Sequence, residues 1–308
     1  MMKNRVLIAS AACVALAVSL TAMSKHPTGE QGLLQARIAE LEAKVAALEA
    51  RMADSTVLQL DGYLVLDTTD ISRPTARFNG VNLQVVNGAG AESEVPNGLG
   101  NILIGYDQPY TQREGGEFES VCALGTYLDE SSCLAAGYDW APQHKSGSHN
   151  LIIGPGHRYS WLYGIAAGLD DTINNEGSSV IGARFGVAQG LRAIVMGGST
   201  NRALGNNSVV LGGWDNLASG LASKVVGGVH NAATDQGATV SGGNYNRASG
   251  FNSTVSGGSE NIASGPQSVI SGGYKNVAEG EYSVVGGGQE RSAQGMSDWV
   301  AGSLFQDY

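Results

Sequence analysis

Five residues between positions 149 and 171 have side chains that could perform acid–base chemistry. Asp170 and Asp171 are adjacent carboxylates, and three basic side chains come shortly before them at His149, His157 and Arg158. Paired carboxylates and histidines supply the general acids and bases of polysaccharide cleavage, and parallel β-helices host polysaccharide lyases. Such pairs are nevertheless common, and the narrow repeats around them leave no obvious cleft. We therefore expect no catalytic residues, with a polysaccharide-acting β-helix enzyme as the alternative.

Cysteines provide the second candidate chemistry. Cys122 and Cys133 form an even pair once Cys13, which lies near the N-terminus, is set aside. In an exported chain such a pair predicts a disulfide, which would close a short loop and contribute about 3 kcal/mol. The alternatives are free thiols or half of a metal site with His144 and His149. Because that spacing matches no zinc pattern, we expect no metal and no cofactor.

The N-terminus predicts export. Lys3 and Arg5 precede an apolar run over residues 6–22, which ends in a possible cleavage site. Residues 1–22 are thus predicted to be a signal peptide, or an N-terminal anchor if they are not cleaved, and lipidation at Cys13 is a third possibility. We expect the protein at the cell surface, associated with an outer membrane, or secreted.

Composition narrows the partners. Among 308 residues there are 45 glycines, about twice the average share, and only 15% are charged. The net charge of −10 disfavours binding to phosphate backbones, so we expect no nucleic-acid partner. The chain also has no polybasic patch for anionic lipids. Membrane contact is expected only through an uncleaved N-terminal segment.

A fifteen-residue period runs through the C-terminal half of the chain. Its consensus is S-x-V-x-G-G-x-x-N-x-A-x-G-x-x, and its most visible mark is a Gly-Gly pair that begins at Gly197, Gly212, Gly227, Gly242, Gly257, Gly272 and Gly287. A repeat this short is typical of one turn of a β-solenoid with two short strands and two corners. The predicted fold class is all-β, a parallel β-roll or β-solenoid with 15-residue turns over residues 151–300.

Strand alternation predicts which repeat positions lie inside. Counting back two residues from the first Gly gives a β-branched residue, and counting back four gives Ser or Ala. Because alternate side chains share a face, the small residue, the β-branched residue and the first Gly are assigned to a narrow interior. The β-branched set is Val180, Val195, Val210, Val225, Val240, Val255, Ile270 and Val285.

An asparagine follows the first Gly by four residues in most turns. Stacked turns lie about 4.7–4.9 Å apart, so these side chains should form a ladder that satisfies corner backbone groups. We interpret them as structural rather than as ligands. The set is Asn201, Asn216, Asn231, Asn246, Asn261 and Asn276.

Segments such as Ser208–Gly213 and Asn261–Gly265 resemble the head repeats of YadA-like trimeric autotransporter adhesins. The resemblance covers roughly residues 151–295 and implies a left-handed parallel β-roll packed as a trimer. The repeat here has fifteen residues where that family typically has fourteen, and the second Gly and the Asn look like the additions. Residues 207–212 match the family's collagen-associated motif only in part, so collagen binding is not expected. The family's C-terminal barrel anchor has no counterpart in the sequence pattern.

Residues 30–54 predict a coiled coil that precedes the roll. Three heptads place apolar residues at both core positions: Ile38, Val45 and Met52 at a, and Leu34, Leu41 and Leu48 at d. Arg37 and Lys44 at g would meet Glu42 and Glu49 at e′ in a parallel assembly. The pattern predicts a homo-oligomer. Ile or Val at a with Leu at d leans toward a dimer, whereas the family resemblance favours a trimer. A single amphipathic helix packed on its own domain is the alternative.

Outward-facing positions suggest how the roll could be used. Apolar residues such as Ile181, Met196 and Leu211 would form a stripe for chain association. Residues between Gly-Gly and Asn occupy one corner of each turn and are the candidate contact loops, with Trp214, His230, Tyr245 and Tyr274 as their aromatic members. Covering the corner is an equally plain role for them.

Taken along the chain, the sequence predicts four parts: residues 1–22, the coiled coil at 30–54, a β-rich neck or cap with the disulfide insertion at 55–150, and the head repeats at 151–300. The expected function is a non-enzymatic surface protein with an adhesin-like head that attaches to an unknown surface, matrix or glycan. An ice-binding solenoid is a further alternative, although it would need a regular flat array of threonines.

Overall fold

The computed structural model describes residues 29–53, 60, 62–90, 95–108, 120–123, 127, 129–141 and 144–302. Two compact units make up the chain, residues 1–83 and residues 84–308. The predicted signal peptide at residues 1–22 lies outside the described residues. Within the described ranges, no helix combines the length and the apolar character needed to cross a membrane.

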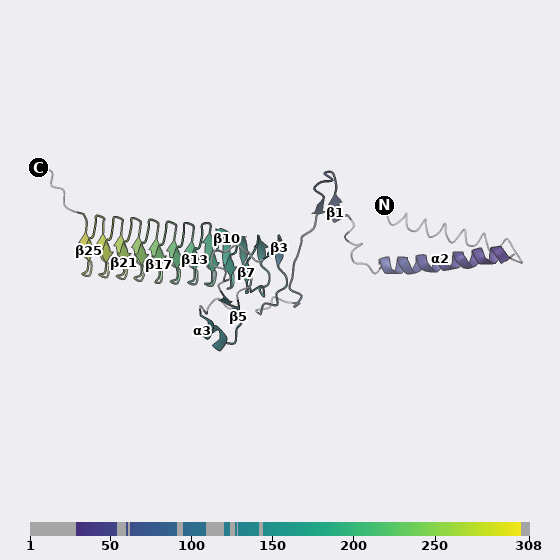
Figure 1. The fold of residues 1–308 in the computed structure, drawn as a ribbon, viewed down its shortest axis with the longest axis horizontal. Helices are drawn as coiled ribbons and strands as arrows, with labels where there is room; N and C mark the ends of the chain where they lie inside the picture. Colours follow the sequence, from purple (N-terminus) through teal and green to yellow (C-terminus); the bar gives the residue numbers. More distant parts are fainter. Residues whose placement is uncertain are drawn as a thin grey trace. The chain divides into compact units, whose positions relative to one another are not determined.

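The described residues of the first unit form one helix and one hairpin, both labelled in Figure 1. Helix α2 covers Gly29–Ala53, so the predicted coiled-coil segment is helical. The six heptad core residues are 37–62% exposed in the single chain, from Ile38 at the low end to Leu34 at the high end. Strands β1 (Leu64–Asp67) and β2 (Thr75–Phe78) pair antiparallel. Both strands are exposed along nearly their whole length.

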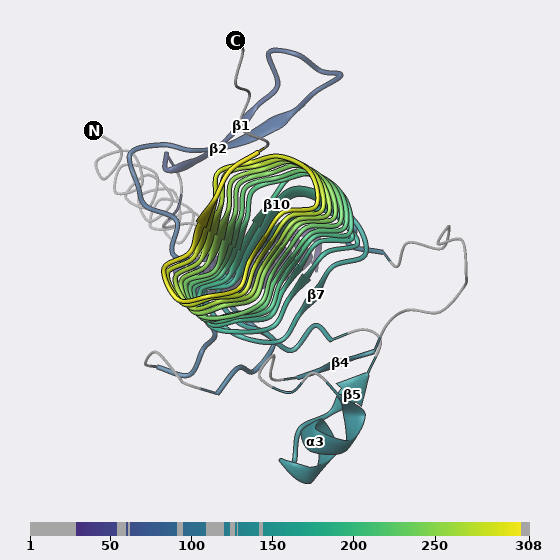
Figure 2. The same cartoon turned by 90° about the vertical axis from the view of Figure 1, so that its left-hand side faces the viewer.

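The second unit is the predicted parallel β-solenoid, seen from the side in Figure 1 and down its stack in Figure 2. Its described residues form two parallel sheets, one of 12 strands and one of 10 strands. The larger sheet contains β3 (Ile102–Ile104), β6 (Leu151–Ile153), β8 (Ile165–Leu169), β10 (Ser179–Arg184), β12 (Ile194–Met196), β14 (Val209–Val210), β16 (Lys224–Val225), β18 (Thr239–Val240), β20 (Thr254–Val255), β22 (Val269–Ile270), β24 (Val284–Val285) and β26 (Trp299–Val300). The smaller sheet contains β7 (Arg158–Tyr159), β9 (Thr172–Ile173), β11 (Val187–Ala188), β13 (Arg202–Ala203), β15 (Leu217–Ala218), β17 (Ala232–Ala233), β19 (Arg247–Ala248), β21 (Ile262–Ala263), β23 (Val277–Ala278) and β25 (Ser292–Ala293).

A narrow core runs along the axis of the roll between the two sheets. The β-branched column of the first sheet is fully buried, and Val210, Val225, Val240 and Val255 are each 0% exposed. Facing it, the alanine column of the second sheet is also fully buried. One bulky side chain per turn therefore packs against one methyl group, as the repeat predicts. Repetition of this pairing keeps every turn nearly superimposable in Figure 2.

The first Gly of each pair was predicted to face the interior, and that prediction is wrong. Early turns are fourteen residues long, since Leu151 pairs with Ile165 and Ile165 with Ser179. The register then shifts between Ile181 and Ala183, which makes Gly182 a bulge residue. Gly182 corresponds to Gly197, fifteen positions on, so the inserted residue of each later pair is the first Gly and not, as predicted, the second.

The two glycines of a pair differ in the space around their Cα atoms. A Cβ placed on Gly227 would meet nothing within 4 Å, whereas one on Gly228 would lie 2.1 Å from the carbonyl oxygen of Gly243. Gly228 also has a φ of +88°. The second Gly is therefore the position where backbone approaches backbone between turns, and the first Gly is the added residue that points into open space.

The disulfide insertion lies beside the N-terminal turns of the roll. Strands β4 (Val121–Cys122) and β5 (Trp140–Ala141) pair antiparallel, and helix α3 (Glu130–Ala135) lies between them in sequence, with Asp129 as its N-cap. The predicted Cys122–Cys133 disulfide is confirmed. Asn174 Nδ2 of the roll donates to the Cys122 carbonyl at 3.2 Å, which ties the insertion to the turn that contains β9.

The last described turn departs from the repeat at two core positions. Arg291 stands where the six preceding turns have Asn, and Asp298 stands where the preceding turns have a buried Ser or Ala. The Asp298 carboxylate accepts from the Gly295 amide at 2.6 Å, and Trp299 is 70% exposed. Polar and bulky residues thus close the end of the stack.

Candidate functional site

The asparagines form one hydrogen-bonded column, the Asn ladder, at the corner before each strand of the smaller sheet. Oδ1 of each Asn accepts from the backbone N–H of the next Asn, as Asn246 does from Asn261 at 3.0 Å. Nδ2 of Asn246 donates to the carbonyls of Gly242 and Gly258, each at 2.9 Å. The ladder residues are 0–1% exposed. Their side chains bind the backbone of two turns at once, so they hold the stack rather than a ligand.

The same column continues toward the N-terminus through residues that look catalytic in the sequence. Asp107 Oδ1 accepts from the His157 amide at 3.0 Å, and His157 Nδ1 accepts from the Asp171 amide at 3.3 Å. Asp171 Oδ1 accepts from the Gly186 amide at 2.8 Å. His157 Nε2 lies 2.9 Å from the carbonyl oxygen of Ile153, four residues back, as each Asn amide does.

His157 therefore replaces two of the three side-chain bonds of an asparagine. Nδ1 accepts and Nε2 donates, which requires the neutral imidazole with its proton on Nε2. Burial lowers the pKa of His157, in agreement with a neutral ring. The residue is 1% exposed, so its two nitrogens serve the backbone and are closed to a substrate.

Asp171 replaces an asparagine in its protonated form. A Cβ placed on Gly168 would clash with Asp171 Oδ2 and with the Ala183 carbonyl, just as one on Gly198 would clash with the Asn201 amide nitrogen and a carbonyl. Oδ2 thus occupies the place of an N–H donor beside a carbonyl oxygen. Burial, with a smaller contribution from the nearby charge of Asp170, raises the pKa of Asp171 to about 8. A protonated carboxyl supplies the donor that the position needs.

The other candidate acid–base residues are also internal or apart. Arg158 pairs with Asp170 at 3.2 Å and donates to the Thr172 hydroxyl at 2.8 Å, and all three are at most 3% exposed. His149 stacks on Tyr163 with 5.9 Å between ring centroids. Among the described residues no group of three or more His, Cys, Asp or Glu could hold a metal ion. The five residues that suggested acid–base chemistry in the sequence are therefore structural parts of the N-terminal turns of the roll.

The side chains at the corner before each ladder Asn point outward. The residue just before the Asn has a left-handed backbone although it is not glycine, with φ of 54° at Asp215, 53° at His230 and 56° at Tyr245. Such a conformation costs on the order of 1 kcal/mol in a free chain, and here the bonds of the neighbouring turns hold it. This corner column continues through Glu260 and Lys275 in register.

Three of the four predicted contact residues meet at this corner. Trp214 and His230 have ring centroids 4.6 Å apart, and His230 and Tyr245 have centroids 4.8 Å apart. His230 Nδ1 also lies 2.8 Å from Asp215 Oδ2. Tyr274 lies further along the stack, where the Lys275 ammonium covers its ring at 5.0 Å. The corner thus carries an aromatic cluster followed by a charged segment.

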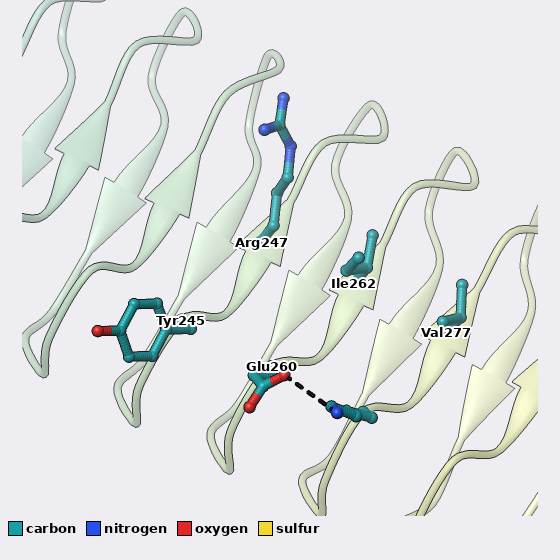
Figure 3. A pocket seen from close by; sticks show the side chains of 6 residues that line it. Tyr245, Arg247, Glu260, Ile262 and Val277 are labelled. Atoms are coloured by element: carbon teal, nitrogen blue, oxygen red, sulfur yellow. Dashed lines mark ion pairs between the residues drawn. The ribbon is translucent and has the colours of Figure 1, made fainter.

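A shallow groove of about 610 Å³ opens beside this column (Figure 3). Its corner side is lined by Tyr245, Glu260 and Lys275, and its strand side by Arg247, Ile262 and Val277 from β19, β21 and β23. Glu260 and Lys275 form an ion pair at 3.7 Å, drawn as a dashed line. The groove runs across three consecutive turns. All of its lining residues occupy repeat positions whose residue type varies from turn to turn.

The opposite sheet carries the predicted apolar stripe. Ile181, Met196, Leu211 and Val226 lie on neighbouring strands or directly after them and are 39–48% exposed. Ser241 and Ser256 take the same position in later turns. The stripe therefore covers the N-terminal half of the roll and gives way to small polar residues beyond it.

No protein-family model matches the chain, and no curated protein is significantly similar to it. The arguments about function therefore rest on the geometry of the roll itself.

Proposed function

We propose that the protein is a non-enzymatic, exported surface protein whose roll serves as an adhesin-like head in a homotrimer. The observation that carries the proposal is the division between the inside and the outside of the repeat. In the column from Asp107 to Asn276, the buried side chains of Asp, His and Asn bind backbone groups. The residue type varies between turns mainly at the corners and the outward strand positions. This arrangement suits a surface that presents side chains to a partner.

Exposed apolar surface supports association of identical chains. The heptad core of α2 and the stripe of Ile181, Met196, Leu211 and Val226 are both uncovered in the single chain. Burying one such side chain contributes about 1.5–3 kcal/mol, so an uncovered seam of this size favours a partner. Arg37 and Lys44 both bind Glu40 of their own helix. Within the described residues Glu42 and Glu49 make no ion pair, so in a parallel assembly they would compete with Glu40 for Arg37 and Lys44 of a neighbouring chain.

Multivalency would be the mechanism of attachment. Each turn repeats the same corner at a spacing of about 4.8 Å, and an assembly multiplies these corners again. Weak contacts at several corners then combine into an avidity that exceeds any single affinity. A rigid rod is well suited to this task, because its contact groups are already ordered before binding.

The solenoid fold also fits the two alternatives. A polysaccharide-acting enzyme would need solvent access to Asp170 and Asp171, which are each 0% exposed. An ice-binding face would need a continuous threonine array, and the outward column of the larger sheet has only Thr239 and Thr254 in adjacent turns. Neither alternative gains support from a particular contact.

Light scattering on the purified mature chain, combined with an adhesion assay, tests the proposal. We expect a trimeric mass and binding to a surface or matrix. Deleting residues 34–52 and placing charges at Ile194 and Val209 should give a monomer that keeps its strand signal in circular dichroism but loses adhesion. A monomeric wild type would contradict the assembly. Adhesion that persists in a verified monomer would contradict the avidity mechanism, and saturable glycan cleavage would contradict the non-enzymatic role.

A further inference from the structure

We propose that the groove beside Tyr245 binds a carboxylate-bearing sugar residue of an acidic polysaccharide. The proposal rests on the proposed attachment function and assigns it a ligand class. The groove combines a guanidinium, an ammonium–carboxylate pair, an aromatic ring and an apolar floor within three turns.

Arg247 supplies the group that would recognise a carboxylate. Its side chain is exposed at the outward position of β19, and in Figure 3 it extends away from Glu260. Among the described residues no carboxylate forms an ion pair with Arg247. A guanidinium binds a carboxylate through two parallel hydrogen bonds, which gives direction as well as charge. Arg247 is thus a cation presented without an internal counter-ion.

The remainder of the groove suits a sugar ring. Ile262 is 39% exposed and lies beside Val277 on the next strand, while the Tyr245 ring is 58% exposed at the edge. Sugar rings have C–H faces that pack on aromatic and aliphatic surfaces. Glu260, half of the ion pair with Lys275, is a hydrogen-bond acceptor that would face the sugar hydroxyls.

Glu260 is also the reason for preferring a sugar acid to an acidic peptide. Side-chain carboxylates of a peptide are acceptors only, so they would repel Glu260 while they bind Arg247. A sugar acid carries hydroxyl donors next to its carboxylate and can satisfy both residues. The acceptor Glu260 beside the cation Arg247 therefore favours a sugar acid over an acidic peptide.

The net charge of the chain does not oppose such a ligand, because the charge lies mostly outside the roll. Residues 144–302 contain nine Lys or Arg and ten Asp or Glu. One of these acidic residues, Asp171, is buried and has a raised pKa. The surface around the groove is thus close to neutral overall, and local cations can dominate within a Debye length of about 8–10 Å.

Titration of the full chain with a short oligogalacturonate of defined length tests the inference, since a short ligand excludes avidity. We expect saturable binding that weakens at least tenfold in Arg247→Ala and partly in Arg247→Lys. Arg202→Ala is the matched control, because Arg202 occupies the same strand position three turns away and is also exposed. Thermal melts should show that all three variants stay folded.

Each other outcome has a defined meaning. Equal weakening by Arg247→Ala and Arg202→Ala would show nonspecific attraction and overturn the site. Equal binding of poly-L-glutamate would overturn the choice of a sugar. Adhesion to surfaces without any binding of the oligogalacturonate would overturn the inference and leave the proposed function intact. Binding of the oligogalacturonate without adhesion would support the groove and contradict the proposed function.

Discussion

Asp171 Oδ1 accepts a hydrogen bond from the backbone amide of Gly186 at 2.8 Å, the same bond that Asn201 Oδ1 accepts from Asn216 at 3.0 Å. A carboxyl group therefore does the work of an amide in the first turns of the roll. Because its second oxygen stands in a donor position, the neutral form of Asp171 fits the fold and the charged form does not.

Stability should fall as the pH rises from about 4 to about 8 because of Asp171. Its pKa is raised from 3.8 to about 8 in the folded chain, so the folded state holds a proton that the unfolded state has released. This contribution to the free energy of unfolding is fully present below about pH 4 and is lost above about pH 8. It amounts to several kcal/mol, because each pKa unit of difference between the folded and unfolded chains corresponds to about 1.4 kcal/mol. Denaturation midpoints at several pH values measure it.

Asp171→Asn supplies a permanent donor and should remove this pH dependence while it raises stability at pH 9. His157, Arg158, Asp107 and Asp170 surround the site in both variants, so the two chains differ only at position 171. Parallel pH profiles for wild type and variant would show that Asp171 is already charged at neutral pH.

Substitutions at three positions of one turn should differ sharply in their effect on stability. Val240→Asp places an unpaired charge in a fully buried column and should unfold the turn. Asn246→Ala removes two Nδ2 donors and one Oδ1 acceptor and should cost about 1–3 kcal/mol for each buried group left unpaired. Tyr245→Ala changes an exposed ring and should have little effect. Thermal melts rank them, and greatest damage from Tyr245→Ala would invert the inside–outside assignment.

The two glycines of one pair should also differ. Gly228→Ala introduces a Cβ against the Gly243 carbonyl at a φ of +88°, so it should destabilise the roll by more than 1 kcal/mol. Gly227→Ala is its matched control, because a Cβ there meets nothing within 4 Å. Chemical denaturation of both variants decides the matter, and equal losses would mean that the first Gly is not the inserted bulge residue.

The closing turn should prevent rolls from joining end to end. A second roll stacked on this end would bury the Asp298 carboxylate in a column of Ser and Ala, and the Arg291 side chain in the column of the Asn ladder. Replacing Arg291→Asn and Asp298→Ser together should therefore give concentration-dependent growth in length. Small-angle scattering follows it, with the Arg291→Asn single variant as the control. An unchanged length in the double variant would place the barrier elsewhere.

Much of the roll follows from the period, because Val and Asn recur at positions whose burial depends only on strand alternation and stacking. Asp171 and His157 escaped the same argument although they lie thirty and forty-four positions before Asn201, in its column. Gly186 interrupts the column of asparagines between Asp171 and Asn201, so the period does not show that Asp171 and His157 belong to it. Charged residues then suggest catalysis, because their position in the repeat is not considered. The left-handed corner at Tyr245 was equally hidden, because local preference disfavours it and only the stacked neighbours impose it.

The in-register stacking makes the length of the head an adjustable ruler. Each turn bonds only to the turns before and after it, and Asn216, Asn231 and Asn246 present identical bonds at each level. Removing fifteen consecutive residues would bring one ladder member onto another and shorten the rod by about 4.8 Å. Removing fourteen would leave one turn a residue too long, and the roll would have to accommodate it in a further bulge like that at Gly182. Gene duplication in units of one turn can thus set how far the corners are carried from their support, without redesigning any contact.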